Sequence, residues 1–157
     1  MNINLIIVGK TEEKFLNEGI DMYLNRLKHY INFNIICIPE LKNVKSFSQE
    51  QIKVKEGEKI LEKINTSDEL ILLDEVGKEF NSVGFSNFIQ TKINSGLKTL
   101  TFVIGGAYGF SDDVYKRGNQ KIALSQLTFS HQMVRLFFVE QVYRAFTIIK
   151  NEKYHHQ

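Results

Sequence analysis

Residues 102–114, FVIGGAYGFSDDV, decide the fold that this sequence predicts. A run of apolar and β-branched residues indicates a buried strand, which leads directly into Gly105 and Gly106. Gly109 follows three residues later, and Ser111 begins a pattern typical of a short helix. In α/β proteins, ligands commonly bind where a strand ends in a loop before a helix, so this loop is the first candidate site.

These glycines match neither of the two common phosphate-binding motifs. The dinucleotide fingerprint needs a glycine where this chain has Ala107, and the P-loop needs a Gly-Lys-Ser/Thr sequence that the chain lacks. Residues 105–110 therefore form either a plain tight turn with a positive φ angle, or a loop whose backbone approaches a ligand that carries no triphosphate.

Strand and helix patterns alternate along the whole chain on both sides of this loop. Strands are predicted at residues 2–8, 32–38, 69–73, 100–104 and 122–124. Helices are predicted at residues 12–27, 48–64, 82–93, 111–117 and 131–150. Ser48 and Gln51 are spaced as a capping box at the start of the second helix. The alternation predicts one α/β domain over residues 1–157, with a parallel sheet and helices on both faces.

Composition limits the class of protein. The 157 residues carry a formal net charge of +2 and are 43% hydrophobic, which suits one domain with a core. So small a charge permits contact with nucleic acid without arguing for it. The single cysteine, Cys37, excludes a disulfide within the chain and indicates a reducing compartment. With no signal peptide and no apolar run of membrane-spanning length, the sequence predicts a soluble, cytoplasmic protein.

Three loops follow predicted strands, at residues 74–78, 105–110 and 125–130. Because ligands of parallel sheets bind at the carboxyl ends of strands, these loops together predict a pocket with backbone donors and apolar walls. Such a pocket suits a small aromatic or nucleoside ligand. No Ser-His-Asp or Cys-His arrangement accompanies it, and the histidines lack the spacing of metal ligands, so no metal is expected.

The helix predicted at residues 131–150 is apolar on nearly all sides, which indicates burial on two sides. It lies either deep in the core of one chain or, as we favour, in a dimer interface. Its few polar residues form one narrow stripe, in which Glu140 and Arg144 are an i,i+4 pair in the favourable order. Arg144 either serves this pair alone or holds its guanidinium at the edge of the pocket for an anionic partner.

Three segments together resemble a known family: FVIGGAYGF (102–110), LSQLTFSHQMVRLFFVEQVYRAF (124–146) and NEKYHH (151–156). They resemble the small SPOUT-class methyltransferases of large-subunit ribosomal RNA, which methylate N3 of a pseudouridine in 23S rRNA. The opening INLIIVGK and the loop LLDEVGKEFNS fit as well, so the resemblance covers essentially the whole chain. It implies a deep trefoil knot in the C-terminal part, although knots are rare among folds. It also implies a homodimer with its active site at the interface, acting on 23S rRNA within the ribosome.

The resemblance further implies S-adenosyl-L-methionine as the cofactor, bound by the loops of the knot. The residues that match the family's donor site are Leu73, Gly105, Leu124, Ser125, Gln126, Leu127, Thr128 and Phe129. The catalytic candidates are His131, Arg144, Tyr154 and His155, among which the general base stays open. For His131, an ordinary polar residue at a helix start is the alternative.

The tail departs from the family pattern at one position. The family commonly follows Tyr-His with Arg or Lys, whereas this chain has His156 and then Gln157. A histidine that is neutral at pH 7 makes a weaker contact with an RNA phosphate, and binding that depends on it varies with pH.

Two other functions stay open from the sequence. The chain is either a SPOUT methyltransferase for another RNA, such as tRNA, or a module that binds S-adenosylmethionine without transferring methyl. Enzymes of the first kind usually carry extra RNA-binding domains, for which 157 residues leave no room. Replacing Arg144 or Tyr154 with alanine distinguishes such a binding module from an enzyme. In an enzyme the replacement lowers methyl transfer and leaves cofactor affinity intact, whereas a binding module has no transfer activity that could fall.

Overall fold

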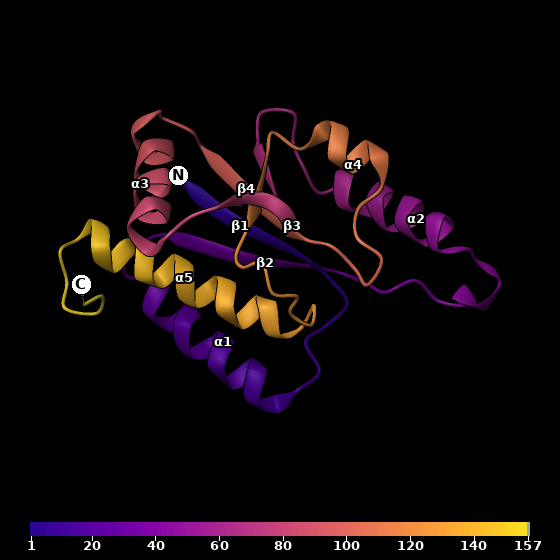
Figure 1. Ribbon diagram of the computed structural model, residues 1–157, viewed down its shortest axis with the longest axis horizontal. Helices are drawn as coiled ribbons and strands as arrows, with labels where there is room; N and C mark the ends of the chain where they lie inside the picture. Colours follow the sequence, from indigo (N-terminus) through magenta and orange to yellow (C-terminus); the bar gives the residue numbers. More distant parts are fainter. Residues whose placement is uncertain (157) are drawn as a thin grey trace.

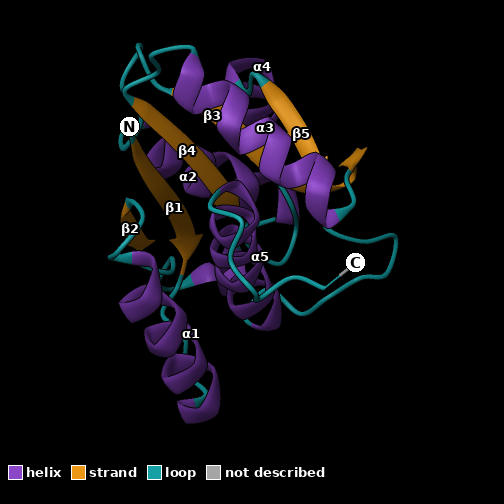
Figure 2. Cartoon of the chain, turned by 90° about the vertical axis from the view of Figure 1, so that its left-hand side faces the viewer, coloured by secondary structure: helices purple, strands orange, loops and turns teal. Residues whose placement is uncertain are grey.

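The computed structural model describes residues 1–156 and contains one sheet of five strands. In chain order, the strands are β1 (Asn2–Val8), β2 (Asn32–Ile38), β3 (Glu69–Glu79), β4 (Thr99–Ile104) and β5 (Gln120–Ala123). They lie side by side in the order β2-β1-β4-β3-β5, and every neighbouring pair is parallel (Figure 2). The predicted parallel α/β sheet is therefore confirmed. Gln157, the last residue of the predicted domain, lies outside the described residues.

Helices cover both faces of the sheet, as predicted. They are α1 (Lys14–Leu27), the 3-10 turn η1 (Val44–Ser46), α2 (Gln49–Leu61), α3 (Ser82–Asn94), α4 (Asp112–Arg117) and α5 (Met133–Ile149). Figure 1 shows α1, α3 and α5 grouped on one side of the strands, and α2 with α4 on the other. Within residues 1–156, no helix is both long and apolar enough to cross a membrane.

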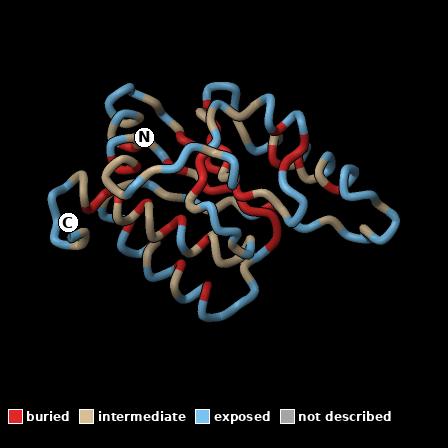
Figure 3. Tube along the Cα trace, in the orientation of Figure 1, coloured by how far each residue is buried: buried red, intermediate tan, exposed pale blue. Residues whose placement is uncertain are grey.

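The two faces of the sheet carry separate hydrophobic cores, with burial concentrated along the strands (Figure 3). On the face of α5, the ring of Phe138 lies 4.7 Å from that of Phe102 and 6.4 Å from that of Phe85. On the opposite face, Ile60 of α2 and Val114 of α4 pack onto the sheet. Strands buried on both faces explain why the sequence shows continuous apolar runs rather than alternation.

Side-chain caps fix where several helices begin. The capping box at α2 forms as predicted, with Ser48 Oγ accepting from the N–H of Gln51 at 3.1 Å and Gln51 Oε1 accepting from the N–H of Ser48 at 2.8 Å. Asn81 and Ser111 cap α3 and α4 without a capping box, each accepting one bond from a backbone N–H, that of Gly84 and that of Val114. α1 has no side-chain cap and begins at Lys14, later than the predicted residue 12.

The predicted end of the third strand at Leu73 is wrong. β3 leaves β5 after Leu73 and pairs with it again at Lys78, so that residues 74–77 loop out within the strand. Gly77 allows this, because a Cβ at that position would lie 2.5 Å from both the backbone N and the backbone C of Ile122. The contact comes from a segment distant in the sequence, so the local pattern indicates only a turn.

Replacing Gly77 with valine is expected to destabilise the fold by about 2 kcal/mol, the usual scale for overpacking against backbone that cannot move aside. Urea unfolding followed by circular dichroism would show the loss as a lower midpoint. The matched control is Val76→Ala, whose side chain is 69% exposed and whose midpoint should stay at the wild-type value. Equal midpoints for all three proteins would contradict the close approach of Gly77 to β5.

The apolar surface of α5 is covered mainly within one chain. The helix packs between α1 and α3 and against β4. Its buried apolar residues are Phe138, Val139, Val142, Ala145 and Phe146. Of the two explanations for its pattern, the structure supports a place deep in one core, so the pattern does not by itself require a dimer. Phe137, which is 41% exposed, is the part of the helix left open.

The chain returns across the sheet between β5 and α5. β5 is the edge strand beyond β3, yet α5 lies over β4 between α1 and α3, so residues 124–132 cross back over strand ends. Buried Arg135 fixes the start of α5, donating from Nη2 to the carbonyl of Val8 at 2.7 Å and from Nη1 to Thr11 Oγ1 at 2.9 Å. A return of this kind is what the C-terminal knot implied by the resemblance requires.

Candidate active site

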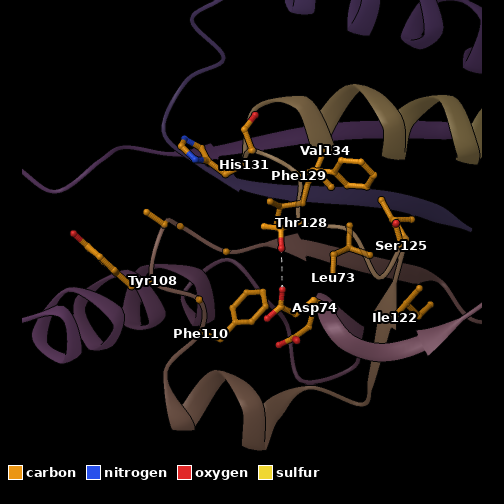
Figure 4. Close-up of a pocket in the computed structure, with 18 of the residues that line it drawn as sticks. Leu73, Asp74, Tyr108, Phe110, Ile122, Ser125, Thr128, Phe129, His131 and Val134 are labelled. Atoms are coloured by element: carbon orange, nitrogen blue, oxygen red, sulfur yellow. Dashed lines mark hydrogen bonds between the residues drawn. The ribbon is translucent and has the colours of Figure 1, made fainter.

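A cavity of about 630 Å³ lies at the carboxyl ends of β3, β4 and β5 (Figure 4). It is lined by the end of the paired part of β3, the loop between β4 and α4, and the loop between β5 and α5. These are the three strand-end segments that the sequence singles out, so the predicted pocket is present. Its volume is typical of a site for a small ligand.

The glycine loop, residues 105–110, is a tight turn that also lines the cavity. The N–H of Gly109 donates to the carbonyl of Gly106 at 3.1 Å, and Gly109 has a φ of +80°, as the turn interpretation expects. A Cβ at Gly106 would collide with the carboxylate of Glu56 on α2. The two interpretations of this loop are therefore compatible, because a single tight turn brings its backbone to the cavity.

The loop between β5 and α5, residues 124–132, has no regular secondary structure. Ser125 Oγ accepts a hydrogen bond from the N–H of Leu127 at 2.9 Å, which folds the start of the loop. Thr128 Oγ1 lies 3.5 Å from Glu75 Oε2, a long contact that links this loop to β3 (Figure 4). An irregular loop of this length leaves backbone donors and acceptors free of any ladder, and a ligand can use them.

Most of the donor-site candidates line the cavity. They are Leu73, Gly105, Leu124, Ser125, Leu127, Thr128 and Phe129. Gln126 is exposed and is not among the lining residues. Asp74, Glu75, Tyr108 and Phe110 also line the cavity and lie in the predicted loops, although none of them was a donor-site candidate. Sequence reasoning missed Tyr115 and Val134, which lie on helices and reach the cavity only through the tertiary fold.

The chemistry of the walls fits a nucleoside without phosphate groups. Apolar side chains from the strand ends, such as Leu73, Ile104 and Ile122, form much of the surface. Asp74 and Glu75 are the only charged side chains among the lining residues, which include no lysine or arginine. A phosphate would therefore find no cationic partner. Within residues 1–156, no group of three or more His, Cys, Asp or Glu could hold a metal ion.

Tyr115 and Asp74 form the best-defined polar contact in the cavity. The hydroxyl of Tyr115 donates to Asp74 Oδ2 at 2.6 Å, and Asp74 Oδ1 accepts from the N–H of Val76 at 3.0 Å. Burial, and next the hydrogen bond to Asp74, raise the pKa of Tyr115 to about 12. The phenol therefore stays protonated and donating across the neutral range.

Alkaline titration should reveal this contact. The ultraviolet difference between wild type and Tyr115→Phe is expected to show one tyrosinate appearing near pH 12 instead of about pH 10. Because this folded pKa lies above the unfolded value, the stability due to Tyr115 is full below about pH 10 and is lost as the pH rises toward 12. Asp74→Asn should move the signal toward pH 10. A wild-type signal already at pH 10 would contradict the hydrogen bond.

Three of the four catalytic candidates meet at the C-terminal end of α5. Glu140 Oε1 accepts from Nε and Nη2 of Arg144, at 3.1 and 2.6 Å, and from the hydroxyl of Tyr154 at 3.0 Å. The guanidinium carbon lies 4.8 Å from the centroid of the Tyr154 ring, and Nη1 lies 3.3 Å from Nδ1 of His155. Arg144 therefore does more than pair with Glu140, because it also holds the tail. We call Glu140, Arg144, Tyr154 and His155 the tail cluster.

Protonation within the tail cluster follows from these contacts. Burial, followed by hydrogen bonds with Tyr23 and Glu140, raises the pKa of Tyr154 well above its usual range. Tyr154 thus remains a protonated donor and is poorly suited to act as a general base. Because the guanidinium of Arg144 can only donate hydrogen bonds, Nδ1 of His155 accepts in its contact with Arg144 Nη1.

The catalytic candidates lie near opposite ends of α5. His131 lines the cavity just before the helix begins, whereas Arg144 lies about ten residues beyond Val134, or about 15 Å along the axis. In Figure 1 the C-terminus lies past the far end of α5. Neither Tyr154 nor His155 is among the lining residues, so within one chain the tail does not reach the cavity.

Comparison with known proteins decides the family. Residues 1–155 match the family described as "Predicted SPOUT methyltransferase". This chain belongs to the SPOUT methyltransferase family. Among its relatives are proteins from Flavobacterium psychrophilum, Flavobacterium johnsoniae and Parabacteroides distasonis, which are 64%, 60% and 54% identical to it over 157 residues and 100% of each chain. Each is named "Ribosomal RNA large subunit methyltransferase H".

Membership of the SPOUT family confirms the resemblance and makes the chain a methyltransferase. The methyl donor of SPOUT methyltransferases is S-adenosylmethionine. The cavity fits this molecule, because it offers apolar walls, a glycine loop and carboxylates but no cation for a phosphate. The family also implies the C-terminal trefoil knot, in keeping with the return of the chain from β5 to α5.

Proposed function

We propose that this SPOUT methyltransferase transfers the methyl group of S-adenosylmethionine to N3 of a pseudouridine in 23S rRNA. The substrate is the assembled ribosome, in the cytoplasm. The observation that carries the proposal is its similarity to proteins named for ribosomal RNA large subunit methylation, up to 64% identical along the entire chain. A small chain with little surface to spare for RNA gains its specificity from the shape of a folded ribosome.

The cavity would hold the methyl donor. Leu73 would contact it from the end of the paired part of β3 and Gly105 from the loop after β4. The loop after β5 would enclose it with Leu124, Ser125, Leu127, Thr128 and Phe129. When bound, S-adenosylmethionine supplies an activated methyl group on a positively charged sulfonium. The protein therefore mainly has to orient two reactants and keep water away from them.

The tail cluster would act on the base. N3 of pseudouridine loses a proton as it accepts the methyl group, so negative charge develops on the ring. Arg144, held by Glu140 and Tyr154, presents a fixed cation to that charge. Since Tyr154 stays protonated, removal of the N3 proton falls to His131 or His155.

The active form would be a homodimer in which the tail cluster of one copy faces the cavity of the other. The separation of the two groups along α5 supports this arrangement, because one chain alone leaves them far apart. Exposed apolar side chains suited to a second copy include Leu127 in the loop after β5, at 74% exposure, and Phe137 on α5.

The test is methyl transfer from labelled S-adenosylmethionine to ribosomes that lack this modification, followed by nucleoside analysis of the 23S rRNA. The expected product is a methylated pseudouridine in a stem-loop of the large subunit, formed much faster on ribosomes than on free rRNA. Transfer to tRNA instead would favour a different RNA substrate. Donor binding without transfer to any RNA would leave a binding module and overturn the proposal.

A further inference from the structure

The charged side chains that line the cavity are carboxylates. Its charged lining residues are Asp74 and Glu75, and no lysine or arginine faces it from any of the three lining segments. His131 is the only other lining side chain that can carry a full charge near neutral pH. With His131 neutral, a ligand in the cavity meets a net negative environment.

Asp74 is the carboxylate held in a fixed position. Both of its oxygens accept hydrogen bonds, Oδ2 from the Tyr115 hydroxyl at 2.6 Å and Oδ1 from the N–H of Val76 at 3.0 Å. Figure 4 places Asp74 beside Phe110 in the cavity. Glu75 has only the 3.5 Å contact with Thr128, so its position is less firmly set. Lys121 contacts the hydrogen-bond partner of Asp74, with its Nζ 5.5 Å from the centroid of the Tyr115 ring.

The methyl donor and its product differ by one charge. In methyl transfer the S–CH₃ bond breaks, both of its electrons stay on sulfur, and the sulfonium becomes a neutral thioether. S-adenosylmethionine thus carries one more positive charge than S-adenosylhomocysteine, while their adenosine and amino-acid parts are identical. A group that separates the two ligands has to sense the sulfur.

We propose that Asp74 is a specificity-determining residue of the donor cavity, where its fixed carboxylate favours the cationic methyl donor over the neutral thioether product. This inference rests on the proposed function, since it concerns the same cavity and the same donor. An attraction that disappears when the methyl group leaves would let the product dissociate and the next donor bind. The two carboxylates of the cavity also exclude anionic adenine nucleotides, which share the adenosine but carry phosphates that the carboxylates would repel.

Calorimetric titration of the unlabelled protein with each ligand tests the proposal without any turnover. Wild type is expected to bind S-adenosylmethionine about tenfold more tightly than S-adenosylhomocysteine, the scale of one charge-assisted contact. Asp74→Asn should weaken binding of the donor by about that factor and leave the product nearly unchanged. Sinefungin, which carries a protonated amine in place of the methyl sulfonium, should follow the donor.

The matched control is Asp112→Asn, because Asp112 is an exposed carboxylate in the first turn of α4 and does not line the cavity. It should leave the ratio of the two affinities as in wild type. A second measurement needs no variant: raising the salt concentration should lower the wild-type preference for the donor, since mobile ions screen the attraction. If Asp74→Asn does not fold, this salt dependence still decides the question.

Several results would overturn the inference. Equal weakening of both ligands in Asp74→Asn would place the carboxylate at the shared amino-acid or ribose part. Equal wild-type affinities with no effect of salt would show that the cavity does not sense the sulfur, while donor binding, and with it the proposed function, would survive. Failure of wild type to bind either ligand would remove the proposed function together with this inference.

Discussion

Arg144→Ala is expected to lower methyl transfer to ribosomes by about 100-fold while the affinity for S-adenosylmethionine stays at the wild-type value. The loss follows because the guanidinium is the one fixed cation that the tail cluster can present to a base losing its proton. Affinity is spared because no arginine lines the cavity that would hold the donor, and the tail cluster would act on the base instead. Single-turnover transfer and calorimetric titration measure the two quantities separately.

Two further variants sharpen this experiment. Arg144→Lys keeps the charge but cannot reproduce the two bonds to Glu140 together with the contact to His155, so an intermediate rate is expected. Lys150→Ala removes an exposed cation just past the end of α5 and should leave the rate unchanged. A wild-type rate of methyl transfer in Arg144→Ala would contradict a role in the reaction and show that Arg144 serves only to pair with Glu140.

The fold could be predicted from the sequence to the extent that its signals are local. Continuous apolar runs and helical stripes predicted every strand and α-helix but not the 3-10 turn η1, and the capping box at Ser48 placed the start of α2. The looping out of residues 74–77 within β3 could not be predicted, because it depends on contact between Gly77 and β5, which are neighbours only in the folded chain. The place of α5 between α1 and α3 likewise had no local signal that could separate it from a dimer interface.

The sequence predicted the site residues that lie in loops directly after strands. The three loops at strand ends mark the cavity without any motif, because parallel strands bring their carboxyl ends to one edge. Tyr115 had no such signal, since it sits on a short helix and reaches Asp74 only through the packing of α4. The separation of the tail cluster from the cavity within one chain is set by the length and placement of α5, so no local pattern of residues indicates it.

Mixing two inactive variants is expected to restore activity if the site is shared between copies. Thr128→Trp should fill the cavity from an exposed loop position and block the donor, while its tail cluster stays intact. Arg144→Ala has the opposite defect. Denatured together in equal amounts and refolded, the two chains would form about half mixed dimers, each with one complete site of two. The mixture should therefore recover about a quarter of the wild-type rate.

The mixing ratio makes this result specific. Activity should rise and fall with the fraction of mixed dimers, with its maximum at equal amounts of the two chains, and each variant refolded alone should stay inactive. If the cavity and the tail cluster acted within one chain, every chain in the mixture would carry one of the two defects, and no ratio would restore transfer. Recovered activity therefore requires Arg144 of one copy to serve the donor cavity of the other. That conclusion does not depend on the geometry of any particular dimer.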